Sequence, residues 1–124
     1  MRVIKFRAWD KEEQEMLDWD KFFNFDIAQV FESKGSWGVY PMQYTGLKDK
    51  NGVEIYEGDI VETVYNGEVF AGVVVYDLSE VDFKVTDGKE KYGRNFQYLA
   101  GNDENEVIGN RYENPGLLKE EPTC

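Results

Sequence analysis

The chain has 124 residues, with 14 lysines and arginines against 25 aspartates and glutamates and no histidine, so its formal charge at pH 7 is −11. This length is typical of one folded domain, and 15% of the residues are aromatic, whereas disordered chains are poor in aromatic residues. The absence of histidine excludes Ser-His-Asp and Cys-His catalysis and most zinc sites, and the acidic balance disfavours direct binding of nucleic acid, which needs a basic surface.

The first segment predicts a β-hairpin. Residues 2–9 alternate between apolar and polar side chains, which is typical of a strand with one buried face. A charged turn is expected over residues 10–14, and a second short strand over residues 15–19.

One short helix is predicted after the hairpin. Asp26 is suited to cap its first turn, and Gln29, three residues later, completes a capping-box pattern. Gly35 suits the left-handed residue that commonly follows a helix. A loop over residues 36–41, with Trp37 exposed, is expected next.

Residues 42–114 predict a sheet, because this stretch has no proline and frequent glycine. Strands are expected over residues 60–65 and 68–76, joined at Asn66-Gly67, a dipeptide that favours a type I′ turn. The second of these strands is almost continuously apolar. We therefore expect a central strand that is covered on both faces.

Shorter elements complete the predicted sheet. The alternation over residues 81–86 predicts a strand, a turn follows at Asp87-Gly88, residues 96–99 form a short fragment, and residues 106–112 form the last strand. In the strand over residues 81–86, the side chains expected to point inward are Val81, Phe83 and Val85. Those expected to point outward are Asp82, Lys84 and Thr86.

These elements predict a mainly β fold, namely a small SH3-like β-barrel preceded by an N-terminal β-hairpin and one short helix. Closure of the barrel would remove exposed strand edges. A single β-rich domain is expected over residues 1–114, with the hairpin and helix in 1–41 and the barrel in 42–114. Residues 115–124 are expected to form a mobile C-terminal tail.

Three sequence blocks resemble the YopX family. Residues 42–61, MQYTGLKDKNGVEIYEGDIV, resemble its signature, and IKFRAWD at residues 4–10 and EVIGNRYENP at residues 106–115 match further parts of the family pattern. Arg111 stands where family members often have an aliphatic residue. The resemblance implies a mostly β fold and an origin in bacteriophages or prophages, mainly of Gram-positive bacteria, and it carries over no catalytic residue.

Aromatic side chains in and near these blocks suggest a protein-binding site. Tyr44, Tyr56 and Tyr112 are expected to form an aromatic groove for a partner peptide, and the exposed Trp37 would add to it. The alternative interpretation is that the signature reflects only the backbone demands of its turns. No metal site, cofactor site or enzyme activity is expected, because the sequence has no phosphate-binding glycine motif and no spacing typical of metal ligands.

A run of acidic residues near the N-terminus suggests a second hypothesis. The run comprises Asp10, Glu12, Glu13, Glu15, Asp18 and Asp20. Ordered carboxylates could imitate the phosphates of nucleic acid and occupy the basic groove of a host DNA-binding or defence enzyme. The alternative is a solvated face that keeps the protein soluble.

The sequence also bears on location and partners. It has no secretory signal and no apolar stretch that would cross a bilayer, so we expect a protein of the bacterial host cytoplasm without membrane contact. The expected partner is an unknown protein of host or phage. Homo-oligomerisation stays open, because the edge of the N-terminal hairpin could pair with a second copy.

Overall fold

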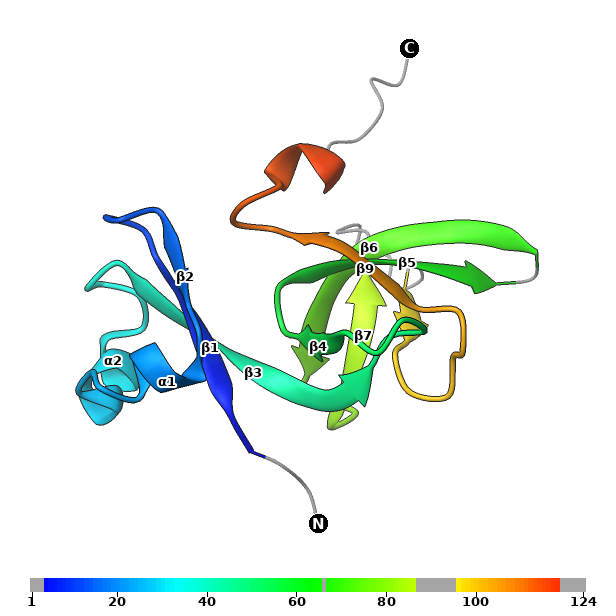
Figure 1. Ribbon diagram of the computed structural model, residues 1–124. Helices are drawn as coiled ribbons and strands as arrows, with labels where there is room; N and C mark the ends of the chain where they lie inside the picture. Colours follow the sequence, from blue (N-terminus) through cyan, green and yellow to red (C-terminus); the bar gives the residue numbers. More distant parts are fainter. Residues whose placement is uncertain (1–3, 66, 87–95, 119–124) are drawn as a thin grey trace.

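The computed structural model describes residues 4–65, 67–86 and 96–118. Within these residues, nine strands form two antiparallel sheets, and the second sheet curls into a half-barrel (Figure 1). The predicted mainly β fold is confirmed. The SH3-like closure of the barrel stays a prediction.

The first sheet has the strand order β2-β1-β3-β4. Its strands are β1 (Phe6–Asp10), β2 (Glu15–Leu17), β3 (Val39–Lys48) and β4 (Glu54–Tyr56). The hairpin of β1 and β2 was predicted, whereas β3 begins inside the predicted loop over residues 36–41. Figure 1 shows the long strand β3 passing from the helices to the second sheet, so β3 connects the two halves of the molecule.

Helix α1 (Trp19–Phe22) replaces the end of the strand expected over residues 15–19. The physical reason is a local cap, because the side chain of Asp18 accepts the backbone N–H of Lys21 at 3.0 Å and so starts a helix. The structure therefore has one short helix, α1, more than the single helix that was predicted.

Helix α2 (Ile27–Ser33) is the predicted helix, and Asp26 caps it by accepting the N–H of Gln29 at 3.2 Å. The left-handed residue that ends it is Lys34, at φ 51°, one position before the expected Gly35. Gly35 also has a positive φ, and a Cβ atom there would lie 2.5 Å from the ring of Tyr40. The close approach of helix and strand therefore needs a glycine at this position.

The second sheet has the strand order β8-β7-β6-β5-β9. Its strands are β5 (Asp59–Tyr65), β6 (Glu68–Asp77), β7 (Asp82–Thr86), β8 (Phe96–Tyr98) and β9 (Glu106–Asn110). Strand β6 is central, as predicted. The last strand ends at residue 110 and not at 112, because residues 111–113 turn toward η2 (Pro115–Leu118).

Four side chains of this sheet differ from the expectations, and one of them is Thr86, which is buried although it was expected to point outward. Val69 of β6 is exposed, so β6 is covered on both faces only in its middle. Val81 lies before β7 and is exposed rather than inward, whereas Lys84 is buried because it forms an ion pair with Asp77 across the hairpin at 2.6 Å. The predicted turn residues Asn66 and Asp87-Gly88, and residues 119–124 of the predicted tail, lie outside the described residues.

Each half of the molecule has its own hydrophobic core. The core residues under α1 and α2 are Ala8, Leu17, Phe22, Val30 and Val39. Those inside the second sheet are Ile55, Val61, Val74, Val85 and Leu99. Any functional surface therefore belongs to one half or to the junction between them.

Candidate functional site

An ion pair of β1 with β5 holds the junction of the two sheets. The Nη2 atom of Arg7 lies 2.7 Å from the Oδ1 atom of Asp59, and the Oδ2 atom of Asp59 accepts the N–H of Tyr56 at 2.8 Å. The guanidinium of Arg7 also lies 4.7 Å from the centre of the Tyr56 ring. Burial raises the pKa of Asp59, although Arg7 and the N–H of Tyr56 act against the shift. Both carboxylate oxygens of Asp59 therefore have partners within the fold.

Tyr44 and Tyr56 of the predicted groove do come together, on β3 and β4, with their ring centres 5.4 Å apart. Lys5 lies 5.1 Å from the centre of the Tyr44 ring and forms an ion pair with Glu54 at 2.7 Å. Tyr44 is buried, and burial raises the pKa of its hydroxyl. This pair of rings is thus packed between charged neighbours.

Tyr112 and Trp37 lie elsewhere. Tyr112 follows β9 and stacks on Trp9 of β1, with ring centres 5.8 Å apart and planes at 17°, and it stacks in the same way on Tyr40 of β3. Trp37 is exposed in the turn before β3. The four predicted aromatic residues therefore occupy three places: a pair made of the buried Tyr44 and the half-buried Tyr56, a stack at the junction and one exposed indole.

Half of the predicted acidic face takes part in local structure. Asp10 accepts the N–H groups of Glu12 and Glu13 in the β1–β2 turn, and Asp18 caps α1. Glu15 forms an ion pair with Lys21 at 2.7 Å. The other three side chains of the run are exposed, namely Glu12, Glu13 and Asp20.

An exposed aromatic patch on α1 and α2 is a feature that the sequence interpretation missed. Three exposed phenylalanines form the patch: Phe25 and Phe31, which pack beside the buried Phe22, and Phe23, which packs against Trp19. The ring centre of Phe22 lies 6.2 Å from that of Phe25 and 6.3 Å from that of Phe31, and Phe23 is 63% exposed. Exposed apolar groups that gather in this way mark interaction sites.

The sequence contained a signal for this aromatic patch. Four phenylalanines fall between residues 22 and 31, and a helix of seven residues, of which only Val30 is buried, cannot cover them all. The surroundings are acidic, since residues 10–34 contain eight aspartates and glutamates against three lysines, a formal charge of −5. The aromatic patch is therefore an apolar surface within an anionic region.

The described part of the chain offers neither a metal site nor a membrane-spanning helix. Its histidine, cysteine, aspartate and glutamate side chains form no group of three or more that could hold a metal ion. Within the same residues, no helix has the length and apolar character needed to span a membrane.

Comparisons with known proteins agree with the β architecture. A family model described as YopX protein matches residues 5–119. Protein EF1440 from Enterococcus faecalis has a similar crystal structure, with a TM-score of 0.56 and 26% identity over 96% of this chain and 100% of that one. Protein yopX from Bacillus subtilis has a similar fold, with a TM-score of 0.53 and 21% identity over 98% of this chain and 99% of that one. The comparison with curated proteins gave no match.

Proposed function

The chain belongs to the YopX family, and from this premise we propose that it is a non-enzymatic protein-interaction module that binds its partner through the aromatic patch. The observation that carries the proposal is the exposure of three phenylalanines, with Phe25 and Phe31 beside the buried Phe22 and Phe23 against Trp19. Aromatic side chains are enriched in the centres of protein interfaces, where their burial supplies much of the binding energy.

The charge around the aromatic patch indicates the chemistry of the partner. Asp18 caps α1, Asp20 lies in α1 and Glu32 lies in α2, so these acids come from the helices that the exposed rings adjoin. A complementary surface would place apolar side chains against the rings and lysines or arginines at the rim. The partner is therefore a protein with an apolar surface bordered by positive charge.

The absence of enzyme activity is part of the proposal, and it is supported by the hydrogen bonds and the ion pair that the buried carboxylates form. Asp59 is the buried carboxyl with a raised pKa, a property common in catalytic acids, yet Arg7 and the N–H of Tyr56 occupy its oxygens. Asp49 accepts three backbone N–H groups. These contacts support structural roles for both side chains.

Mimicry of nucleic acid is the second candidate function, and the formal charge of −11 favours it. A mimic needs an ordered array of free carboxylates. In the acidic run Asp10 and Asp18 cap local structure and Glu15 pairs with Lys21, so three of its six carboxylates already have contacts within the chain. The contacts of this run therefore support the aromatic patch more than mimicry.

The setting of this activity is also part of the proposal. The family resemblance implies a bacteriophage or prophage origin, so we propose that the protein acts in the cytoplasm of the bacterial host. Its partner would then be a protein of the host or of the phage.

A capture experiment at two salt concentrations tests the proposal. The tagged protein is incubated with lysate of the bacterium that carries the gene, and bound proteins are quantified at 0.1 and 0.5 M salt, with and without duplex DNA as competitor. An apolar contact predicts a partner that is retained at high salt and is unaffected by DNA. Release by salt together with competition by DNA would support mimicry instead. A dimer of the purified protein that dissociates when Phe23 is changed to serine would identify a second copy as the partner.

A further inference from the structure

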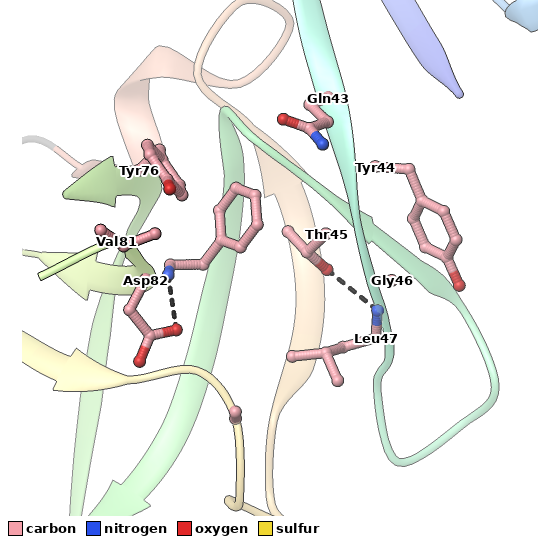
Figure 2. Close-up of a pocket in the computed structure, with 10 residues that line it drawn as sticks. Gln43, Tyr44, Thr45, Gly46, Leu47, Tyr76, Val81 and Asp82 are labelled. Atoms are coloured by element: carbon pink, nitrogen blue, oxygen red, sulfur yellow. Dashed lines mark hydrogen bonds between the residues drawn. The ribbon is translucent and has the colours of Figure 1, made fainter. Parts of the chain in front are cut away.

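A cleft of about 580 Å³ opens between β3 and the hairpin of β6 and β7, in the half of the molecule away from the aromatic patch (Figure 2). Thr45 and Leu47 of β3 point into it, whereas the ring of Tyr44 points to the other side of the strand. Val81, the last residue of the four-residue turn between β6 and β7, and Ala100 also line it. The volume falls within the range of about 300–1,000 Å³ that is common for ligand sites, so the cleft is large enough to hold a small molecule.

Two aromatic rings continue the core of the second sheet into this cleft. Tyr76 and Phe83 are partners across β6 and β7. Each lies two residues from a buried valine of its own strand, Val74 or Val85, so all four side chains share the inner face of the sheet. The two rings meet edge to face, with their centres 5.0 Å apart and their planes at 65°. Because Tyr76 is 37% exposed, the fold leaves this aromatic corner open to solvent.

Two uncharged polar side chains of the cleft are available to a ligand. Gln43 and Tyr76 both line the cleft, and within the described residues neither the amide of Gln43 nor the hydroxyl of Tyr76 forms a hydrogen bond. Figure 2 shows the amide of Gln43 directed from β3 toward the wall that holds Tyr76. The hydroxyl of Thr45, in contrast, donates to the carbonyl of Ile55 at 2.8 Å and accepts the N–H of Leu47 at 3.1 Å. The cleft therefore offers a ligand one amide and one phenol.

The described residues turn no charged side chain into the cleft. Asp82 is paired with Asp77 and shares the outer face of the sheet with Lys84, so its carboxylate lies away from the cleft. No lysine or arginine is among the ten described residues that line the cleft. The formal charge of −11 adds a general repulsion of anions. Phosphate-bearing and other anionic ligands are therefore disfavoured, and the cleft is suited to a neutral one.

We propose that this cleft binds a neutral oligosaccharide. A pyranose ring has C–H groups on its faces and hydroxyl groups around its edge, so one face can lie on the aromatic corner while the hydroxyls meet polar groups. One sugar hydroxyl donates to the Oε1 atom of Gln43, and another accepts the O–H of Tyr76. The edge-to-face rings fit a puckered sugar better than a flat heterocycle, which would cover only one of them. This site is separate from the aromatic patch, and the inference goes beyond the proposed protein binding.

The test is an NMR titration of the full ¹⁵N-labelled chain with four trisaccharides. Three of them are neutral, namely maltotriose, mannotriose and triacetylchitotriose, and the fourth, trigalacturonic acid, is anionic. The proposal predicts saturable shifts with at least one neutral trisaccharide, at the backbone signals of Gln43, Thr45, Leu47, Tyr76 and Phe83. Trigalacturonic acid should bind at least about tenfold more weakly than that sugar, because no cation lines the cleft to pair with its carboxylates.

Two variants separate binding from folding. Tyr76→Phe keeps the ring and removes only a hydroxyl without a hydrogen bond in the described chain, so it should weaken sugar binding about fivefold and leave the thermal midpoint unchanged. Gln43→Met, of similar length, removes the amide and should have a similar effect on binding. Tyr98→Phe is the matched control, because Tyr98 is 46% exposed but is paired with Lys84 on β7, and its hydroxyl donates to Glu80 at 2.7 Å. This control should bind the sugar as the wild type does.

Several results would overturn the inference. Shifts that fail to saturate with all three neutral trisaccharides, or that centre on α1 and α2, would show that the cleft binds no neutral sugar. Equal affinity for trigalacturonic acid would contradict the preference for an uncharged ligand. A Tyr76→Phe chain that binds as tightly as the wild type would remove the hydroxyl from recognition and contradict the proposed contacts. The titration contains no protein partner, so its failure leaves the capture experiment on the aromatic patch unaffected.

Discussion

Arg7 and Asp59 join the two sheets by one ion pair, in which the Nη2 and Oδ1 atoms are 2.7 Å apart and the side chains are almost fully buried. Breaking such a pair leaves an uncompensated charge in the interior. We therefore expect Arg7→Met to lower the free energy of unfolding by about 3–5 kcal/mol. Urea unfolding followed by fluorescence measures this change.

Lys21 provides the matched control for this prediction. Its ion pair with Glu15 has the same length, 2.7 Å, but both side chains are exposed. Lys21→Met should change the unfolding free energy little, because solvent already screens this pair. Equal losses in the two variants would contradict a special role for the junction.

Asp49 makes stability depend on pH. Burial acts to raise the pKa of its carboxyl, but the N–H groups of Val107, Val53 and Asn51 outweigh burial and hold the pKa below its ordinary value. The unfolded chain therefore takes up this proton first as the pH falls. The contribution of Asp49 is complete above its ordinary pKa and is lost as the pH falls through the lower folded value. Asp49→Asn should flatten the acid side of the stability curve, measured by urea unfolding between pH 5 and pH 2.

Asp59 has the opposite effect on the pH dependence of stability. Because burial raises its pKa, the folded state holds this proton more tightly than the unfolded state. Its contribution to stability falls as the pH rises from the ordinary value through the raised one. Asp59→Asn should therefore remove a decrease in stability over that window. A stability curve with the same shape in the wild type and in both variants would contradict these assignments.

Gly58 and Gly52 separate backbone strain from steric contact. Both have a positive φ, 86° and 84°, so an alanine at either position costs about 1–2 kcal/mol in conformational energy. At Gly58 the added Cβ would also lie 2.9 Å from the Sδ atom of the buried Met42, whereas nothing lies within 4 Å at Gly52. Gly58→Ala should therefore destabilise the chain more than Gly52→Ala, by about 1–3 kcal/mol of overpacking. Equal melting temperatures for the two variants would contradict this.

Substitutions of Tyr44 and Trp37 are expected to have different effects on stability, although the sequence analysis placed both residues in one site. Tyr44 is buried against Tyr56 and under Lys5, so Tyr44→Leu should lose about 1–2 kcal/mol of ring and cation–π contact. Trp37 is exposed, and Trp37→Ser should stay within about 0.5 kcal/mol of the wild type. Thermal unfolding of both variants measures the difference. A stable Tyr44→Leu chain would return Tyr44 to the candidates for binding.

Local signals predicted the local structure well. Asp26 and its bond to the N–H of Gln29 could be read from the sequence because a helix cap involves residues three positions apart. The same rule would have found α1, had Asp18 been taken as a cap instead of as part of an alternating strand. The turn at Asp49 was also accessible, since its side chain accepts the N–H of Asn51 two residues on.

Contacts between residues far apart in the sequence could not be predicted from such local signals. The burial of Lys84 depends on Asp77 across a hairpin, and the side of β7 that faces inward depends on where the four-residue turn ends, at Val81. The separation of Tyr112 from Tyr44 follows from the division of the chain into two sheets, because Tyr44 lies on β3 of the first sheet and Tyr112 follows β9 of the second. The density of phenylalanines over residues 22–31 indicates an aromatic patch, but the fold decides that Phe22 is the one that fills the core.

The most direct test of protein binding through the aromatic patch is a comparison of three tagged chains in quantitative capture from lysate: the wild type, Phe23→Ser with Phe31→Ser, and Val69→Ser. Val69 is a matched control, because it is 69% exposed on the second sheet, as Phe23 is 63% exposed on the first half. We predict that the wild type and the Val69→Ser chain capture the same partner. The double variant, folded by circular dichroism, should lose it at least about tenfold, as expected for removal of a central interface residue. Equal capture by all three chains would contradict the account.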